Sequence, residues 1–329
     1  MNLGPSHKEE RLMTANLHVR EFSWRDVERV YQIAAGAFEQ DFEILGSEKE
    51  AFKRGLAPYR IGKWIQKITR NEYFKFYVGE IHGKVVAVIL VIRGGHYWYI
   101  TTLMVDEKYR RKGYGKDILT SACTTICSAG GERLILHVPE DNTAARALYQ
   151  SLGFKPFEKL INYWRTSEQV TADLPEGYCL TLIDMHDPRA LEITDKCRSP
   201  RSLTIFGKTE LPPWHKRMLE RIFHTGIEEK YALTTGGNWV GICTFRAPLE
   251  KKGAAMIYLH VVPEHRGKGL EEALLSWGLT RACNLGLPRL AVQAKQEHTQ
   301  FTKACEAFNF IQIEVLEGMF KNCANKDRK

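Results

Sequence analysis

The chain of 329 residues is 44% hydrophobic and 26% charged, which is typical of a globular protein and, at this length, of two domains. No stretch approaches the roughly 20 apolar residues of a membrane-spanning helix, and the first residues lack the apolar core of a signal peptide. The formal net charge of +8 allows an anionic partner, but the basic residues are dispersed, and a solvated surface is the simpler interpretation.

The predicted elements of the first half begin with two helices and a hairpin. The helical patterns cover 24–38 and 48–67, the hairpin 74–92 with its turn at 82–84, and the next strand 98–105. A helix follows the glycines near residue 114, with Ile118, Leu119, Ala122, Cys123, Ile126 and Cys127 at apolar helical spacing. A strand at 133–138, a short helix at about 142–152 and a final extended stretch at 154–164 complete this half.

The second half has the same order of elements. Helices are predicted at 189–195 and 214–225, a hairpin at 231–245 and a strand at 255–261. The polar segment 166–177, with Pro175 and Gly177, is the predicted linker, and 1–13 and 322–329 are predicted as loose tails.

The eight cysteines form neither a Cys-x-x-Cys motif nor a cluster with metal-ligand spacing, so we expect no metal site. Cys123 and Cys127 lie four residues apart within the apolar helical pattern, which favours buried thiols over a disulfide. These features predict a reduced, cytoplasmic protein.

The two halves match without a gap at a constant spacing of 156 residues, the spacing between Arg110 and Arg266. The matched pairs include Leu103 and Leu259, Val105 and Val261, Lys112 and Lys268, Gly113 and Gly269, Leu119 and Leu275, Cys127 and Cys283, and Phe154 and Phe310. Strand, glycine turn, helix and strand recur in the same order, so the chain is predicted to be a duplicated domain.

Residues 103–116 join a buried strand, a turn with two glycines and the start of a helix. Glycines allow a tight turn in which several N–H groups point at one place, and a helix N-terminus adds free N–H groups and the positive end of its dipole. Arg110, Arg111, Lys112 and Lys116 add positive charge. The segment therefore predicts a diphosphate cradle, with a plain basic surface turn as the alternative.

Two other phosphate loops do not match. A dinucleotide-binding loop would have a third glycine in place of Ile118, and a Walker loop would end in Gly-Lys-Ser or Gly-Lys-Thr.

Arg110, Gly113 and Gly115 after an apolar strand resemble the [QR]-x-x-G-x-[GA] motif of the GNAT acetyltransferases, whose backbone N–H groups bind the pyrophosphate of coenzyme A. Residues 142–154, from Asn142 through Tyr149 to Phe154, resemble a second family motif, N-x-x-A-x-x-L-Y-x-x-x-G-F. The motifs occur in the family's order, and the resemblance covers residues 16–165.

This resemblance implies an α/β (α+β) protein with two tandem GNAT folds, each a mixed, mostly antiparallel sheet flanked by helices. The expected divisions are an N-terminal tail at 1–15, a catalytic GNAT domain at 16–166, a linker at 167–177, a degenerate GNAT-like domain at 178–321 and a C-terminal tail at 322–329.

The resemblance also implies acetyl-CoA as cofactor and assigns roles to single residues. Tyr149 would protonate the leaving thiolate, with a packing role as the alternative. The expected cofactor-binding residues are Leu103, Met104, Val105, Arg110, Arg111, Lys112, Gly113, Tyr114, Gly115, Lys116 and Asn142.

The general base is less defined by the pattern. Some family members carry a glutamate on the strand before the glycine turn, where this chain has Tyr99. Residues 136–142 resemble the branch of the ribosomal-protein N-terminal alanine acetyltransferase, but His137 stands where that branch has a glutamate. An imidazole can take a proton near neutral pH, so His137 is the candidate base, with an ordinary strand histidine as the alternative.

The sequence indicates only the general classes of acceptor. The branch resemblance makes a peptide or protein N-terminus one candidate beside small amines. Glu39, Asp41 and Glu43 lie in the region from which this family recognises acceptors, and their carboxylates could attract a cationic amine or be merely solvated.

The second copy departs from the motif. Glu271 replaces the last glycine, and a carboxylate there opposes a pyrophosphate by like charge. At the spacing of 156, Asn142 becomes His298, Tyr149 becomes Cys305 and His137 becomes Gln293. Copy two is therefore predicted to lack catalysis.

The leading hypothesis is an N-acetyltransferase that uses acetyl-CoA on a primary amine. A non-catalytic acyl-CoA-binding regulator is the alternative, and nucleic-acid binding ranks third because the phosphate cradle accounts for the basic run.

Overall fold

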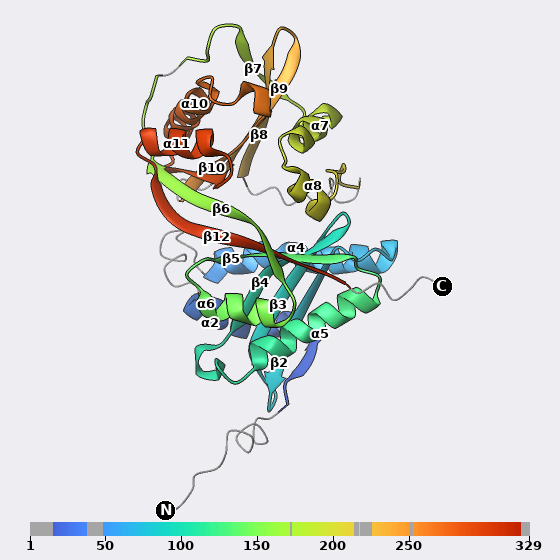
Figure 1. Ribbon diagram of the computed structural model, residues 1–329. Helices are drawn as coiled ribbons and strands as arrows, with labels where there is room; N and C mark the ends of the chain where they lie inside the picture. Colours follow the sequence, from blue (N-terminus) through green and yellow to red (C-terminus); the bar gives the residue numbers. More distant parts are fainter. Residues whose placement is uncertain are drawn as a thin grey trace, which may run out of the picture. The chain divides into compact units, whose positions relative to one another are not determined.

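The computed structural model describes residues 16–37, 49–171, 173–213, 217, 226–249 and 253–323, and Figure 1 shows its elements. The first copy contains β1 (His18–Glu21), η2 (Trp24–Asp26), α2 (Val27–Ala37), α4 (Lys49–Thr69), β2 (Phe74–Ile81), β3 (Lys84–Gly94), β4 (Tyr97–Val105), η3 (Glu107–Tyr109), α5 (Tyr114–Ser128), β5 (Arg133–Pro139), α6 (Thr143–Ser151) and β6 (Lys155–Thr166).

The second copy contains β7 (Tyr178–Ile183), α7 (Pro188–Lys196), α8 (Pro200–Phe206), β8 (Gly226–Thr235), β9 (Asn238–Pro248), β10 (Ala254–Val261), η4 (Pro263–His265), α10 (Leu270–Asn284), β11 (Arg289–Lys295), α11 (Thr299–Ala307) and β12 (Ile311–Asn322). Of the predicted helix at 214–225 only residue 217 is described, and the carboxylates Glu39, Asp41 and Glu43 lie outside the described residues. The predicted class, mixed α/β with a mostly antiparallel sheet, is confirmed.

The last strands of the two copies are exchanged in the sheet. Its order among the described residues is β1-β2-β3-β4-β5-β12-β6-β11-β10-β9-β8-β7. Strand β6 pairs antiparallel with β11 of the other copy, for example Tyr163↔Val292, and with β12, for example Ile161↔Val315. An antiparallel ladder satisfies the same backbone groups whichever copy supplies the strand, so the sequence repeat does not fix the partner.

The chain forms two compact units whose limits differ from those of the repeat. Unit 1 holds the described residues up to Leu136 together with residues 321–323, and unit 2 holds His137–Phe320. The repeat, in contrast, divides near residue 166. Strand β12 extends to Asn322, whose Oδ1 accepts a hydrogen bond from Arg133 Nε at 2.7 Å.

Within each unit an apolar helix packs on the sheet. In unit 1, α5 buries Ile118, Leu119 and Ile126, and it contacts β2, β3 and β4. In unit 2, α10 buries Leu274 and Leu279 in a core that includes β9 and β10. The apolar helical spacing predicted this packing, because residues three and four apart share a helix face.

Cys127 was predicted as a buried free thiol, and this prediction is wrong. It forms a disulfide with Cys323, 196 residues later in the chain. The helical spacing identified the buried face of α5 but carried no information on a partner so distant in sequence. Cys123 is a buried free thiol as predicted, and burial raises its pKa to about 11.

None of the helices in the described ranges carries an apolar stretch long enough to cross a membrane.

Candidate functional site

The first glycine turn connects β4 to α5 in unit 1. Asp106 accepts a hydrogen bond from the backbone N–H of Lys108 at 2.9 Å, and Arg110 Nε donates to the carbonyl of Val105 at 3.1 Å. Arg111 has φ 65° and Gly113, the N-cap of α5, has φ 89°, both in the left-handed region. This backbone aims the first N–H groups of α5 outward, where the helix dipole is positive.

The space in front of this turn is open. A Cβ placed on Gly113 would meet no atom of the described residues within 4 Å. The predicted cations Arg110, Arg111, Lys112 and Lys116 are exposed, whereas Tyr114 is buried and Gly115 is half-buried. Free N–H groups, positive charge and an open approach are the features by which helix N-termini can bind an anion such as a diphosphate.

Strand β4 pairs with β5 near its start. The two strands pair at Trp98↔Leu134 and Tyr99↔Ile135, and the described register continues no further. The three predicted cofactor-binding residues Leu103, Met104 and Val105 pair with β3 on the other side. Beyond Tyr99 this side of β4 has no ladder partner in the described register, and unpaired strand backbone of this kind can bind an extended ligand.

The second predicted motif lies in unit 2, on α6. Asn142 is the exposed N-cap of this helix, and its Oδ1 accepts a hydrogen bond from Ala145 N at 3.0 Å. Tyr149 is 7% exposed, and burial raises its pKa to about 12. The hydroxyl has no hydrogen-bond partner in the described part of the chain. Tyr149 therefore keeps its proton at neutral pH.

Helix α6 is attached to the C-terminal strand by an ion pair that the sequence pattern did not indicate. Arg146 Nε donates to Glu317 Oε2 at 2.8 Å, and Glu317 is 6% exposed. Arg146 also donates to the carbonyl of Glu140 at 3.1 Å. A buried carboxylate that is paired twice by one guanidinium holds the helix in a defined position.

His137, the candidate base, lies on β5 in unit 2. Its Nε2 is 3.1 Å from Glu158 Oε1, and both side chains are buried. The structure thus brings His137, Asn142 and Tyr149 into unit 2, and the strand and turn residues 103–116 into unit 1. That these two sets of residues act together on one ligand stays a prediction.

The second glycine turn, between β10 and α10, has the same backbone conformation as the first. Gly267 has φ 69° and Gly269, the N-cap of α10, has φ 82°. Arg266 Nε donates to the carbonyl of Val261 at 2.9 Å, as Arg110 does to Val105. The repeat therefore preserves the cradle in backbone geometry.

The side chain of Glu271 takes part in this second turn. Its Oε2 accepts a hydrogen bond from Gly267 N at 3.2 Å, and the residue is 3% exposed. Burial raises the pKa of Glu271 despite this bond. Pro175 and Gln300 approach the turn, at 3.5 Å and 3.2 Å from a Cβ placed on Gly269 and Gly267. The second cradle is thus filled and covered by its own chain.

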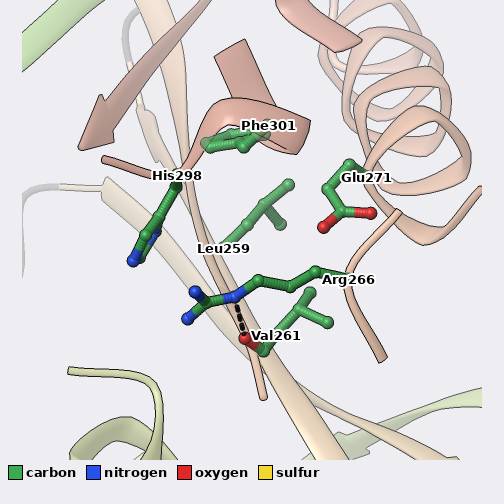
Figure 2. Close-up of a pocket in the computed structure, with 6 residues that line it drawn as sticks. All are labelled: Leu259, Val261, Arg266, Glu271, His298 and Phe301. Atoms are coloured by element: carbon green, nitrogen blue, oxygen red, sulfur yellow. Dashed lines mark hydrogen bonds between the residues drawn. The ribbon is translucent and has the colours of Figure 1, made fainter. Parts of the chain in front are cut away.

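A pocket beside the second turn is lined by Leu259, Val261, Arg266, Glu271, His298 and Phe301. Figure 2 shows His298 and the guanidinium of Arg266 on one side of Leu259 and the carboxylate of Glu271 on the other. His298 does not cap α11 with its side chain, although Asn142 caps α6 at the matching position. Cys305, the counterpart of Tyr149, is fully buried, and burial raises its pKa to about 12.

Residues 27–154 and residues 199–307 both match the acetyltransferase (GNAT) family. The chain is 33% identical over 134 residues to N-alpha-acetyltransferase MAK3 of Arabidopsis thaliana, which is 40% of this chain and 66% of that protein. It is 35% identical over 66 residues to N-alpha-acetyltransferase 30 of Xenopus laevis, which is 20% of this chain and 24% of that protein.

Two solved structures resemble nearly the whole chain. A tandem GNAT protein from the clavulanic acid biosynthesis pathway superposes with a TM-score of 0.65 at 14% identity over 95% of this chain and 100% of that chain. A GCN5-related N-acetyltransferase from Sphaerobacter thermophilus gives 0.63 at 16% identity over 94% and 97%. The predicted arrangement of two tandem GNAT folds is confirmed.

Proposed function

The chain belongs to the acetyltransferase (GNAT) family of enzymes, and on this premise we propose that its N-terminal copy transfers the acetyl group of acetyl-CoA to a primary amine. The acceptor is a small molecule or the N-terminus of a peptide or protein.

The observation that carries this proposal is the open glycine turn before α5. The backbone of Arg111–Gly115 and the side chains of Arg110, Lys112 and Lys116 would hold the pyrophosphate, and the free edge of β4 at Leu103–Val105 would hold the pantetheine arm. Bound acetyl-CoA supplies a thioester whose carbonyl carbon accepts the amine. Asn142 is the candidate for a further contact to pantetheine.

Two proton movements accompany the transfer. The amine nitrogen forms the new C–N bond, the C–S bond breaks, and the phenol of Tyr149 gives its proton to the departing thiolate sulfur. The attacking amine loses one proton, which His137 takes directly or through water. A proton returns from solvent to the phenolate, so the products are the amide and the free thiol.

The acceptor proposal draws on the relatives. Their names describe N-alpha-acetyltransferases, and on this basis peptides with a free N-terminus are the acceptor class proposed here. The matches cover only part of each relative, so small amines and polyamines are tested as acceptors as well.

The test is a screen of acetyl-CoA against peptide N-termini, polyamines, aminoglycosides and simple amines, read by release of the thiol and by product mass. Tyr149→Phe is expected to lower kcat by about 100-fold, within the usual range for acid catalysis, with little change in acetyl-CoA affinity. Unchanged turnover would return Tyr149 to a packing role. Binding of acetyl-CoA without transfer to any amine would instead support the regulator.

A further inference from the structure

His137 and Glu158, both in unit 2, meet across the strand that lies between their own two strands. His137 lies on β5, Glu158 on β6, and β12 runs between them in the sheet order. The residue of β12 that pairs with Glu158 is Gly318. A Cβ on Gly318 would lie 2.9 Å from His137 Nε2 and 2.9 Å from Glu158 Cγ. Both distances are shorter than a real Cβ atom makes, so a larger residue at this position would force the imidazole and the glutamate side chain to shift.

The carboxylate of Glu158 is itself held by the C-terminal copy. Lys295 Nζ, on β11, is 2.8 Å from Glu158 Oε2 and donates to Ser202 Oγ at 3.1 Å. Burial raises the pKa of Glu158, but the hydrogen bond to His137 and the charge of Lys295 outweigh burial and lower it overall. Glu158 is therefore an ionised carboxylate at neutral pH, next to His137.

The repeat provides an internal comparison at the same three positions. At the spacing of 156, His137 corresponds to Gln293, Glu158 to Glu314, and Asn162 to Gly318. In this second set Gln293 Nε2 donates to Asn162 Oδ1 at 2.9 Å, and Asn162 Nδ2 donates to Glu314 Oε1 at 2.8 Å.

A side chain therefore bridges the middle strand in the second set, and no titratable ring is present. In the first set the middle side chain is missing, and the carboxylate reaches the imidazole directly. The direct contact is specific to the copy with the candidate base.

We propose that Glu158, Lys295 and Gly318 are positioning residues for His137, so that the degenerate C-terminal copy supports, through Lys295 and Gly318, the base used by the N-terminal copy. The inference rests on the proposed function, in which His137 takes the amine proton. The carboxylate accepts the Nε2 proton of the ring and thereby places the basic lone pair on Nδ1. When Nδ1 takes the proton, Glu158 stays a carboxylate and stabilises the imidazolium until the proton leaves to solvent.

Charged groups around His137 and Glu158 decide in which direction each substitution moves the titration of the imidazole. Lys295 opposes the imidazolium by like charge, whereas Glu158 favours it. His298 is also near, and burial together with Arg266 and Lys295 lowers its pKa to about 4, so it stays neutral above pH 5. Removal of Glu158 or of Lys295 should therefore move the titration of the ring in opposite directions.

The experiment combines pH profiles of kcat/KM with NMR titration of the His137 ring in the full chain. Glu158→Gln is expected to lower kcat/KM by about 10-fold and to move both the acidic limb and the ring titration to lower pH, because the imidazolium loses its counter-charge. Gly318→Ala should act in the same direction by separating the pair, and Lys295→Gln should move the titration to higher pH. Glu314→Gln is the matched control and should change neither the acidic limb of the pH profile nor the ring titration.

An unchanged ring titration in Glu158→Gln and Gly318→Ala, in proteins that fold normally, would overturn the proposal. This readout needs no turnover, so it is independent of the proposed function. The proposed function fails separately if the wild-type chain transfers no acetyl group, and the assignment of His137 as base fails if the acidic limb survives His137→Gln.

Discussion

The two glycine turns have the same backbone conformation but differ in the space in front of the turn. In both, a left-handed glycine caps the following helix and an arginine binds the carbonyl of the preceding valine. The turn at Gly113 is open, whereas the turn at Gly269 is covered by Pro175 and contains the carboxylate of Glu271. The backbone shape of the turn can thus survive duplication while a carboxyl side chain of the same chain enters it. Glycine spacing alone does not show whether a cradle can take a ligand.

The strongest test of the contrast is a double variant with Tyr149→Phe and Gly113→Val. If only the first copy works, kcat/KM of this protein should fall by about 10⁴-fold, the product of the two single losses, because both the acid and the cradle are lost. The measurement is product formation with an amine identified by the screen. Near-native turnover would mean that the second copy is the enzyme.

The next test compares single variants in the two turns. Gly113→Val should weaken acetyl-CoA binding by about 100-fold, equal to about 2.7 kcal/mol, because its side chain projects into the open space before α5. Gly269→Val imposes the same left-handed strain, of the order of 1–3 kcal/mol, and serves as the control. Calorimetry should find one site per chain in the wild type and in Gly269→Val. Two equivalent sites in the wild type would contradict the asymmetry.

The copies also differ at the end of the helix that follows each turn. Cys127 is bonded to Cys323, whereas its counterpart Cys283 is a free, half-buried thiol. Reduction should lower the free energy of unfolding of the wild type by about 2–4 kcal/mol, since the bond closes a long loop. Cys283→Ser should keep this dependence on reductant, and Cys323→Ser should lose it. Denaturant titrations with and without reductant measure the difference, and equal stability in both conditions would argue against the bond.

The smallest expected effect concerns Glu271 itself. Burial raises its pKa, so its contribution to stability is present below the ordinary value of about 4.5 and is lost as pH rises through the folded value. Glu271→Gln cannot ionise and should gain roughly 1 kcal/mol over the wild type at neutral pH, the scale of a buried polar group with incomplete pairing. The gain should vanish near pH 4. The exposed Glu264 provides the control as Glu264→Gln, and a pH-independent difference for Glu271→Gln would contradict the argument.

Local sequence patterns were sufficient to predict much of the fold. The apolar spacing of Ile118, Leu119 and Ile126 predicted the buried face of α5, and the hairpin at 74–92 corresponds to β2 and β3. These features depend on neighbours a few residues away, which the sequence displays directly. The predicted roles of Tyr149 and Asn142 came from the family motif, and no pattern in the chain itself would have assigned them.

The sequence by itself determined that the chain is a duplication, that each copy has a glycine turn before a helix, and that only the first copy retains Gly115 and Tyr149. Only the tertiary structure decided the exchange of the last strands, the bond of Cys127 to Cys323 and the contact of His137 with Glu158. The reason is physical. Periodicity and turn chemistry act over a few residues, whereas strand order is chosen by hydrogen bonds that any strand of the right length can make. Residues such as Gly318 gain their meaning from the neighbours that this order provides.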